Sequence, residues 1–366
     1  MHSINSWLQK RMADTELVML LASLLVIFVL LSVLGSMLMP VLLGIALAYV
    51  LDGVVDLLTR CKFPRMLAIA LTGGGTLLLL LFTLLAVLPL LTEQVGRLVS
   101  HAPQYVQSIR EMLQQLQANH AEWINPSYLQ KIIAAMAAKL QEWGGALLSF
   151  SIASIPGMIT LLVYAVLVPV MVFFFLKDKE QIIVWAKQFL PTERTLLDRV
   201  WRELDTQIGN YIRGKFWEAF LVGISMWLVY AWMGHEYALL LGVLTGISVW
   251  IPFVGAAVVT FPVILLSFFQ WGWTDTMAYS VLAYAVVQTI DANIVIPWLF
   301  SEIVNLHPIA IVVGILVFGG MWGILGVIIA IPMAALVKSV VSIVLERKTD
   351  KQTCKQSDKG QLQAGG

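Results

Sequence analysis

Long apolar segments separated by short polar stretches dominate this chain, and most are close to the length of a membrane-spanning helix. About 20 uncharged residues suffice to cross the ~30 Å hydrocarbon layer of a bilayer as an α-helix. Such segments lie near residues 17–34, 37–52, 67–91, 157–176, 216–233, 238–270 and 276–300. A last segment, 308–345, is long enough for one kinked span or two short ones. The pattern predicts an all-α polytopic membrane protein.

Two longer polar regions show amphipathic helical periodicity instead. In 93–155, apolar residues recur every three or four positions, which predicts two helices joined as a hairpin, the first interrupted at Pro103. In 178–215, a similar pattern predicts a helix that lies on the membrane surface, packs against neighbours or continues into the span at 216. The chain therefore divides into these predicted parts: spans in 1–92, a helical hairpin in 93–155, a span in 156–177, an amphipathic helix in 178–215, spans in 216–345 and a disordered tail in 346–366.

Glycine and proline punctuate two apolar stretches of the C-terminal half in a similar order. GISVWIPFVGAAVVTFP and GILVFGGMWGILGVIIAIP each place a Trp, then a Gly, then an apolar run that closes on Pro. This loose match suggests an internal duplication and re-entrant hairpins with broken helices, although close helix packing would also use small residues. The candidate hairpin or gate residues are Pro252, Gly255, Gly319, Gly320, Gly323 and Gly326.

Composition agrees with the membrane class and narrows it. The chain is 59% hydrophobic and 12% charged, against about 25% charged residues in typical soluble domains. The alternation of a transmembrane β-strand is absent from these segments, and the first apolar region is too long for a signal peptide. Cys61 and Cys354 have no His or Cys at metal-ligand spacing, so we expect no metal, cofactor or disulfide.

The distribution of Lys and Arg predicts the orientation. Nineteen of the 23 basic residues lie near the N-terminus, in 60–65, in 177–215 and in 338–359. Because positive charge marks cytoplasmic flanks, we expect both termini inside the bacterial inner membrane and 93–155 outside. The loops near 271–275 and 301–307 carry no Lys or Arg, so charge leaves open whether 238–270 crosses once, twice or re-enters.

Asp291 is the most unusual residue of the chain. It is the only charged residue between Asp275 and Glu302, and a charge inside a spanning helix costs at least ~2.5–3.5 kcal/mol on insertion scales. Pro297 cannot donate to the carbonyl of Asn293, so we expect the helix to bend or break there. Gln288 shares the face of Asp291 one turn earlier. These groups would suit a proton, a hard cation or a polyhydroxylated solute; the alternative is a structural or neutral carboxyl group.

Two further sets of polar residues are weaker candidates for a binding role. Pro308 in NLHP is expected at the first position of a helix, with His307 or Asn305 as cap. His307 would then lie at a helix N-terminus, which favours anions, or would simply cap it. Gln207, Asn210 and Arg213 lie at helical spacing and could face a cytoplasmic vestibule or anchor a helix end.

The chain also resembles the autoinducer-2 exporter family, also called the PerM-like permeases. The resemblance rests on VPVMVFFFLKDKEQ (168–181), NYIRGK (210–215), IPFVGA (251–256), QTIDANIVIPWLFSEIVNLHP (288–308) and FGGMWGILGVIIAIPMAALVK (318–338). It covers roughly residues 14–345 and implies a bacterial inner-membrane transporter with about eight spans that assembles as a homo-oligomer. Members are associated with export of the quorum-sensing signal autoinducer-2, and others with sodium/proton antiport.

Three functions follow as alternatives. The first is a secondary transporter that exports a small polar solute, coupled to protons through Asp291. The second is a cation/proton antiporter that uses the same carboxylate, and the third is a membrane scaffold for envelope or cell-division factors that binds through 93–155. No GxxxxGK[ST] motif, HExxH motif or paired-carboxylate arrangement stands out, so we expect neither a P-loop ATPase nor an enzyme, and no nucleic-acid partner.

Overall fold

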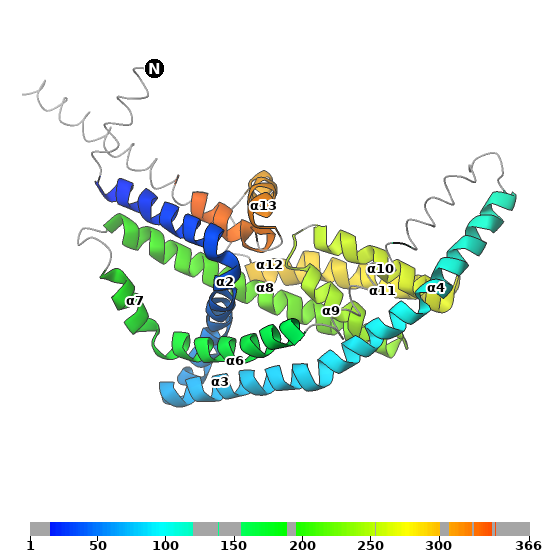
Figure 1. The fold of residues 1–366 in the computed structure, drawn as a ribbon, viewed down its shortest axis with the longest axis horizontal. Coiled ribbons are helices and arrows are strands. Elements are labelled where there is room, and N and C mark those ends of the chain that lie inside the picture. Colours follow the sequence, from blue (N-terminus) through cyan, green and yellow to red (C-terminus); the bar gives the residue numbers. More distant parts are fainter. Residues whose placement is uncertain are drawn as a thin grey trace, which may run out of the picture. The chain divides into compact units, whose positions relative to one another are not determined.

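The fold is described from a computed structural model, and all its regular elements in the described residues are helices (Figure 1). The described residues are 15–119, 138, 155–188, 195–252, 254–300, 307–323, 326–338 and 341. They form two compact units, each assembled from separate stretches of chain. Unit 1 comprises Met1–Leu57, Phe174–Phe216 and Ile296–Gly366, and unit 2 comprises Leu58–Phe173 and Trp217–Val295.

The first helix corrects the predicted N-terminal topology. Helix α2 runs without interruption from Thr15 to Arg60 and carries Pro40 inside it. Two spans at 17–34 and 37–52 would require a turn near residue 35, and no turn occurs there. A proline inside a helix kinks it without reversing it, and Figure 1 shows α2 changing direction along its length. The chain turns only at Cys61 and Lys62, where Lys62 takes a positive φ of 69°.

The next segment, from Arg65 to Asn119, is a continuous run of helix, although its second half is polar. Helix α3 (Arg65–Phe82) passes through a π-helical turn, η1 (Thr83–Val87), into α4 (Leu88–Asn119). Pro103 lies inside α4, so the predicted interruption of the helix at this residue is wrong. Most of the remaining predicted hairpin, from 120 to 154, lies outside the described residues.

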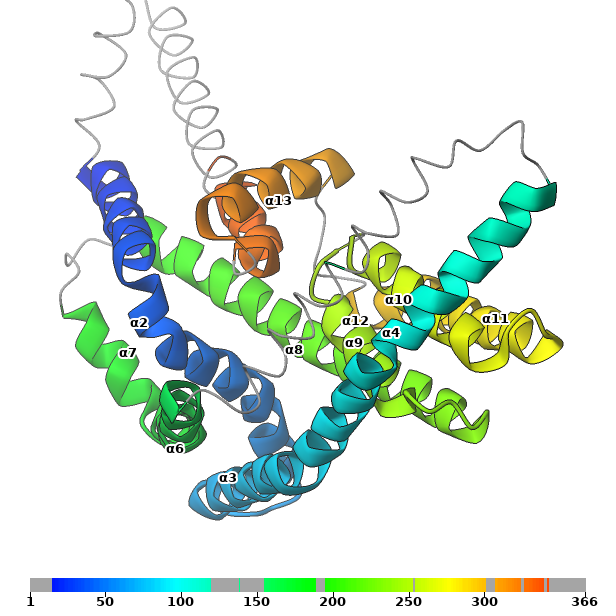
Figure 2. The same ribbon diagram turned by 45° about the vertical axis from the view of Figure 1, so that its right-hand side comes forward.

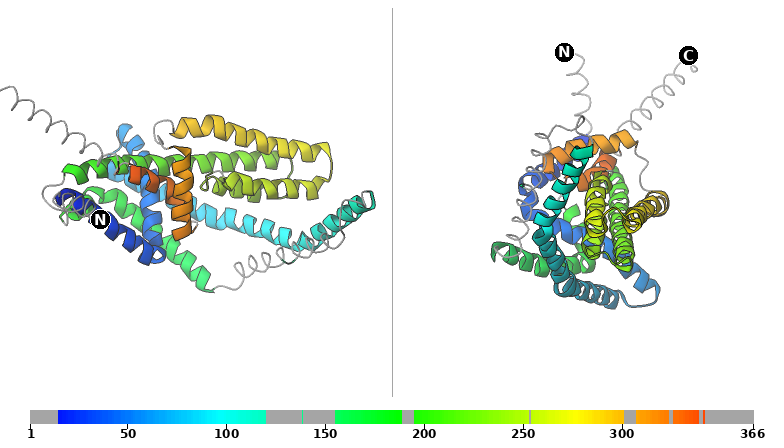
Figure 3. Two further views of the ribbon diagram at one scale, coloured as in Figure 1. Left: turned by 90° about the horizontal axis from the view of Figure 1, so that it is seen from above. Right: turned by 90° about the vertical axis from the view of Figure 1, so that its right-hand side faces the viewer.

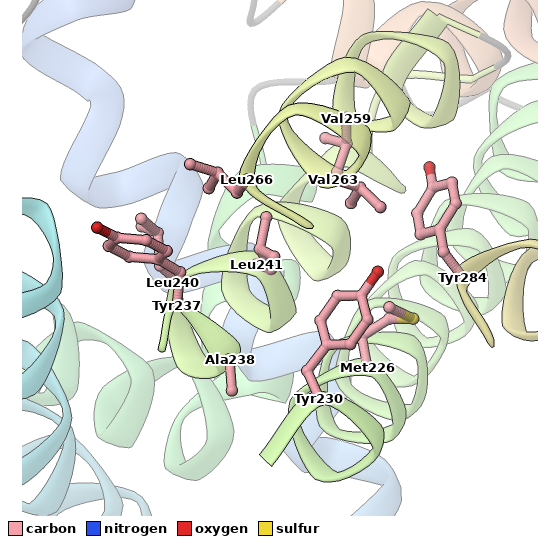
Figure 4. Close-up of a cluster of buried hydrophobic side chains, with 10 residues drawn as sticks. All are labelled: Met226, Tyr230, Tyr237, Ala238, Leu240, Leu241, Val259, Val263, Leu266 and Tyr284. Atoms are coloured by element: carbon pink, nitrogen blue, oxygen red, sulfur yellow. The ribbon is translucent and has the colours of Figure 1, made fainter. Parts of the chain in front are cut away.

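Unit 2 is built around a cluster of buried side chains from four helices. Met226 and Tyr230 come from α8 (Thr195–Trp232), and the others come from α9 (Ala238–Ser248) and its N-cap Tyr237, from α10 (Val254–Trp271) and from α11 (Asp275–Ile290). Figure 4 shows these side chains converging, and Figure 3 shows α9, α10 and α11 running alongside one another.

Small residues and hydroxyl groups hold these four helices together. An added Cβ at Gly246 of α9 would lie 2.7 Å from the Ala219 carbonyl oxygen of α8, so the two backbones nearly touch. The hydroxyls of Ser267 and Ser280 join α10 to α11 at 2.7 Å. Lipid tails are as apolar as the side chains they replace, so close packing and hydrogen bonds of this kind are what holds membrane helices together.

Helix α4 is attached to the same end of unit 2 where α9 begins. The Leu240 backbone N–H donates to Gln94 Oε1 at 2.8 Å, and the Tyr105 and Tyr237 hydroxyls lie 2.8 Å apart. The ring of Tyr105 stacks on Phe269 near the end of α10, with centroids 4.1 Å apart. The start of α9, the end of α10 and the middle of α4 therefore lie together.

Segment 238–270, whose topology the sequence left open, is a helical hairpin. Helix α9 has 11 residues, about 16 Å at 1.5 Å per residue, which is too short to cross the hydrocarbon layer. Gln270, at the end of α10, accepts from the Glu236 N–H at 3.0 Å and donates to the Gly234 carbonyl at 2.9 Å. Because these residues precede α9, both open ends of the hairpin lie on one side.

Unit 1 contains a second hairpin of the same kind near the C-terminus. Helix α13 (Pro308–Trp322) ends at Gly323, and an apolar helix follows from Gly326 to Lys338. Figure 2 shows the second helix folded back against α13. Unit 1 also holds α7 (Lys179–Lys187) and α12 (Ile296–Phe300), and α6 (Ile155–Lys177) is shared between the two units.

Four helices in the described residues are long and apolar enough to span a membrane: Met37–Arg60, Arg65–Glu111, Val254–Trp271 and Asp275–Phe300. Four shorter apolar helices accompany them, among them both α9 and α13. The predicted all-α polytopic membrane class is therefore confirmed.

Candidate functional site

Asp291 is buried inside unit 2, with 6% of its surface exposed. Helix α11 positions it: Thr274 caps the start of this helix, where its hydroxyl accepts from Met277 N–H, and Asp291 follows the last residue, Ile290. At 1.5 Å per residue it lies about 24 Å from the start of the helix. A buried carboxylate in a spanning helix is costly, which makes Asp291 a candidate functional residue.

The helix changes its hydrogen-bonding pattern at Asp291. Residues Asp291–Val295 form a π-helical turn, η2, which leads directly into α12 and its Pro297. The helix is therefore not broken before the proline: the disturbance takes the form of a π turn inside a helix that continues to Phe300. Single π turns within α-helices occur frequently at functional sites.

The residues that were predicted to bind a ligand together with Asp291 have different surroundings in the structure. Gln288 is half-buried, and its Nε2 is a buried donor with no hydrogen-bond partner among the described residues. Asn293 is exposed, and its amide donates to the Thr289 carbonyl at 2.8 Å. Pro297 is exposed as well. Gln288 thus remains beside Asp291 as a candidate donor to a ligand. The Asn293 side chain is engaged along its own helix, and the backbone carbonyl of Asn293, which was the predicted ligand atom, stays a candidate.

Unit 2 also buries a second acid, Glu218, which is not among the candidates from the sequence. It lies on α8, in unit 2, with 2% of its surface exposed. Lys215, one turn earlier on the same helix, is 7% exposed and lies 5.4 Å from the centre of the Phe300 ring. Residues three apart share a helix face, so RGKFWE places two buried charges on one side of α8. The sequence did contain a sign of this buried acid, because Glu218 is a carboxylate that lies two residues after the start of the predicted span 216–233.

The three vestibule candidates have different surroundings on α8. Arg213 Nε donates to the Tyr49 backbone carbonyl of α2 at 2.8 Å, which ties the two helices together. Gln207 donates to Glu203 at 3.2 Å, and Asn210 is half-buried. Arg213 therefore has a structural role, and Gln207 and Asn210 stay candidates.

The hairpin candidates lie at or near the two helix reversals. Gly255 begins the second arm of the α9–α10 hairpin, and an added Cβ there would lie 1.8 Å from the Ser248 carbonyl oxygen. Gly326 has the same place in the second hairpin, 1.8 Å from the Phe318 carbonyl oxygen. Pro252 lies in the first turn, and Gly323 takes a positive φ of 61° in the second.

The remaining glycines are less constrained. An added Cβ at Gly319 would lie 2.8 Å from a Val327 methyl carbon, and one at Gly320 would meet no atom within 4 Å. Gly255 and Gly326 therefore correspond to one another, with a carbonyl of the first arm pressed against a glycine of the second.

His307 occupies the predicted cap position. It is the N-cap of α13, with Pro308 at the first helical position, and its Nδ1 accepts from the Ile309 N–H at 3.3 Å. The capping prediction is confirmed, and the cap engages one of the two ring nitrogens.

The loop between α8 and α9, outside the spans, contains a buried histidine. His235 is 5% exposed and packs against the rings of Tyr230, Tyr237 and Trp271, and its Nδ1 accepts from the Tyr237 N–H at 3.1 Å. Burial lowers the pKa of His235 to about 4, so this imidazole is neutral near pH 7.

Comparison with known proteins gives a consistent result. The profile of the AI-2E family transporters matches residues 17–346. The chain is 37% identical over 339 residues to the permease PerM of Escherichia coli K12, covering 92% of this chain and 95% of that protein. It is 29% identical over 304 residues to the transport protein YueF of Bacillus subtilis, covering 80% of each. These names describe transport and give no reaction.

Proposed function

The chain belongs to the AI-2E family of transporters, and on that premise we propose that it exports a small polar solute across the bacterial inner membrane. The proposed mechanism is secondary transport, with Asp291 as the ion-coupling group and Gln288 beside it. Autoinducer-2 is the first solute to test, because the family name refers to its export and its several hydroxyl groups suit a carboxylate and an amide.

The observation that carries this proposal is the burial of Asp291 at a π turn inside a spanning helix. Such a carboxylate exchanges a proton or binds a cation more readily than it stabilises a fold, since an apolar side chain would cost nothing there. A local widening of the helix also loosens the backbone next to the carboxylate.

The two glycine-locked hairpins support a transporter with an internal repeat. Arg and Lys in 177–215 favour a cytoplasmic start of α8; in that orientation the α8–α9 loop and the open ends of the first hairpin would face outward. Helix α11 would then lead inward, and the second hairpin would open toward the cytoplasm, on the side of the basic tail. Hairpins that enter from opposite sides are typical of inverted repeats in secondary transporters.

Glu218 favours a second candidate function, cation/proton exchange. Exchangers commonly gather more than one intramembrane acid, and unit 2 buries both Glu218 and Asp291. The same two carboxylates would then bind a sodium ion and protons in turn.

A flux assay in everted inner-membrane vesicles tests both functions. Uptake of autoinducer-2 into vesicles that contain the protein, above that of empty vesicles and dependent on an imposed proton gradient, is the expected result. Sodium-dependent proton movement without autoinducer-2 uptake would replace solute export by cation exchange. If neither flux exceeds that of empty vesicles, transport of these two substrates is excluded.

A further inference from the structure

Unit 1 contains a cavity of about 120 Å³ that none of the transport residues lines. Its walls come from α2, from the junction of α6 and α7, and from α8. At about 30 Å³ per water molecule, the space would hold roughly four waters or a ligand of a few non-hydrogen atoms.

The polar side chains of the lining are held in place by contacts with one another. Lys179 Nζ lies 2.8 Å from Asp52 Oδ2, and the side chain of Asp52 is 17% exposed. The Tyr49 hydroxyl donates to Asp205 Oδ1. Tyr49 itself is fixed from two sides, because Arg213 binds its carbonyl and an added Cβ at Gly209 would lie 3.0 Å from its ring.

The ionisable groups of the lining are two carboxylates and one ammonium group, and the Arg213 guanidinium lies beside Tyr49. Two carboxylates, Asp52 and Asp205, face a single ammonium group, Lys179, which is engaged by Asp52. Asp205 is an acceptor only, and the Tyr49 hydroxyl uses one of its lone pairs. The lining therefore offers free acceptor positions on Asp205.

The rest of the wall is apolar and aromatic. Phe175, Ile182 and Trp201 line it, and Trp201 is 51% exposed. Indole faces attract cations. A divalent metal is a poor match, since among the described residues no three His, Cys, Asp or Glu side chains gather as ligands.

We propose that this cavity binds a primary ammonium group on a short carbon stem, with the ammonium donating to Asp205 and the stem lying against Phe175 and Trp201. A free aliphatic amine and the aminoethyl headgroup of a phospholipid share this chemistry. The exposed Ile182 and Trp185 on α7 would place the cavity mouth near a lipid surface.

The test uses the full chain in phosphatidylcholine nanodiscs and follows tryptophan fluorescence, with Trp201→Phe subtracted to isolate the signal at the cavity. Propylammonium is the free probe, and 1-propanol is its uncharged control. A second arm replaces part of the phosphatidylcholine with phosphatidylethanolamine at constant total lipid.

We expect a saturable Trp201 signal with propylammonium, absent with 1-propanol and weakened at least tenfold in Asp205→Asn. Glu203→Gln, the same change at an exposed acid of α8, should bind like the wild type. If the headgroup is the natural ligand, phosphatidylethanolamine raises the apparent Kd for propylammonium; if the source is a free amine, this lipid leaves the Kd unchanged.

Equal binding of 1-propanol, an unchanged Kd in Asp205→Asn or the lack of any saturable signal would overturn the proposal. Should Asp205→Asn not fold, Tyr49→Phe decides, because it frees the Asp205 oxygen and is expected to tighten binding several-fold. Loss of binding in Tyr49→Phe would equally contradict the proposal. None of these readouts depends on transport.

Discussion

At the scale of single residues, the positions that fix this structure are glycines pressed against carbonyl oxygens and polar groups buried among helices. Gly255 and Gly326 each lie where a hairpin closes. A side chain at either position would collide with a carbonyl oxygen of the opposite arm. Asp291 and Glu218 are buried where apolar side chains would be cheaper. The first kind of residue makes the fold possible, and the second kind is the reason to look for a function.

Gly255→Ala should be strongly destabilising. Its new methyl group would lie 1.8 Å from the Ser248 carbonyl oxygen, and backbone cannot yield as a flexible side chain does. Overpacking of this kind costs about 1–3 kcal/mol or more, measured as a lower Tm in detergent. Gly74→Ala in α3 meets no atom within 4 Å and should leave the Tm unchanged or slightly higher. Equal Tm values for both variants would refute the close contact.

His235 should make stability depend on pH. Its pKa falls from 6.5 in the unfolded chain to about 4 in the folded protein, so the unfolded state binds the proton first. The stabilisation is complete above about pH 6.5 and is lost as the pH falls toward 4, by at most roughly 3 kcal/mol.

The check is the Tm measured between pH 7.5 and pH 5 for three proteins. His235→Asn retains an acceptor for the Tyr237 N–H but does not titrate, so its Tm should fall less than that of the wild type. His101→Asn removes the neighbouring histidine of α4 and should retain the wild-type slope. Parallel curves for wild type and His235→Asn would show that His235 does not cause the pH dependence.

At the scale of elements, hydropathy predicted which segments are apolar helices, but it did not predict where those helices end. It divided α2 near residue 35 and α4 at Pro103, yet both helices continue. A helix ends where its backbone groups find other partners, and a change from apolar to polar side chains does not supply these. Conversely, Pro252 and Gly255 indicated the break between α9 and α10 in the sequence, but the close approach of Gly255 to the Ser248 carbonyl oxygen is visible only in the structure.

Gln94 is expected to anchor α4 to the start of α9. Tyr237, the N-cap of α9, makes no capping bond with its side chain, and Gln94 accepts from the buried Leu240 N–H instead. Gln94→Ala should cost about 1–3 kcal/mol and speed hydrogen exchange at the first turn of α9. Gln107→Ala, which removes an exposed amide of the same helix, should change neither; unchanged exchange in Gln94→Ala would rule out the anchor.

At the scale of the whole molecule, the proposed function rests on a defined topology. Positive charge predicts that the ends of the chain lie in the cytoplasm, but it gives no prediction for the loops near 271–275 and 301–307, which lack Lys and Arg. The contacts of Gln270 with Gly234 and Glu236 supply that information for the first loop, because they put both ends of the α9–α10 hairpin on one side.

Cysteine labelling tests this topology in intact cells. In a background with Cys61→Ser and Cys354→Ser, Asp275→Cys should react with a membrane-impermeant maleimide from outside. Ser301→Cys should react only after the membrane is permeabilised. The reverse pattern, or the same accessibility at both positions, would require a different path for the C-terminal half.

The most direct test of the central claim compares gradient-driven autoinducer-2 uptake by everted vesicles that contain wild type, Asp291→Asn or Asp275→Asn at equal expression. Asp275→Asn makes the same chemical change at an exposed position of the same helix. If Asp291 couples transport to an ion, wild type and Asp275→Asn retain the gradient-stimulated uptake, whereas Asp291→Asn loses at least nine-tenths of it. Gradient-stimulated uptake in Asp291→Asn equal to that of the wild type would contradict the account.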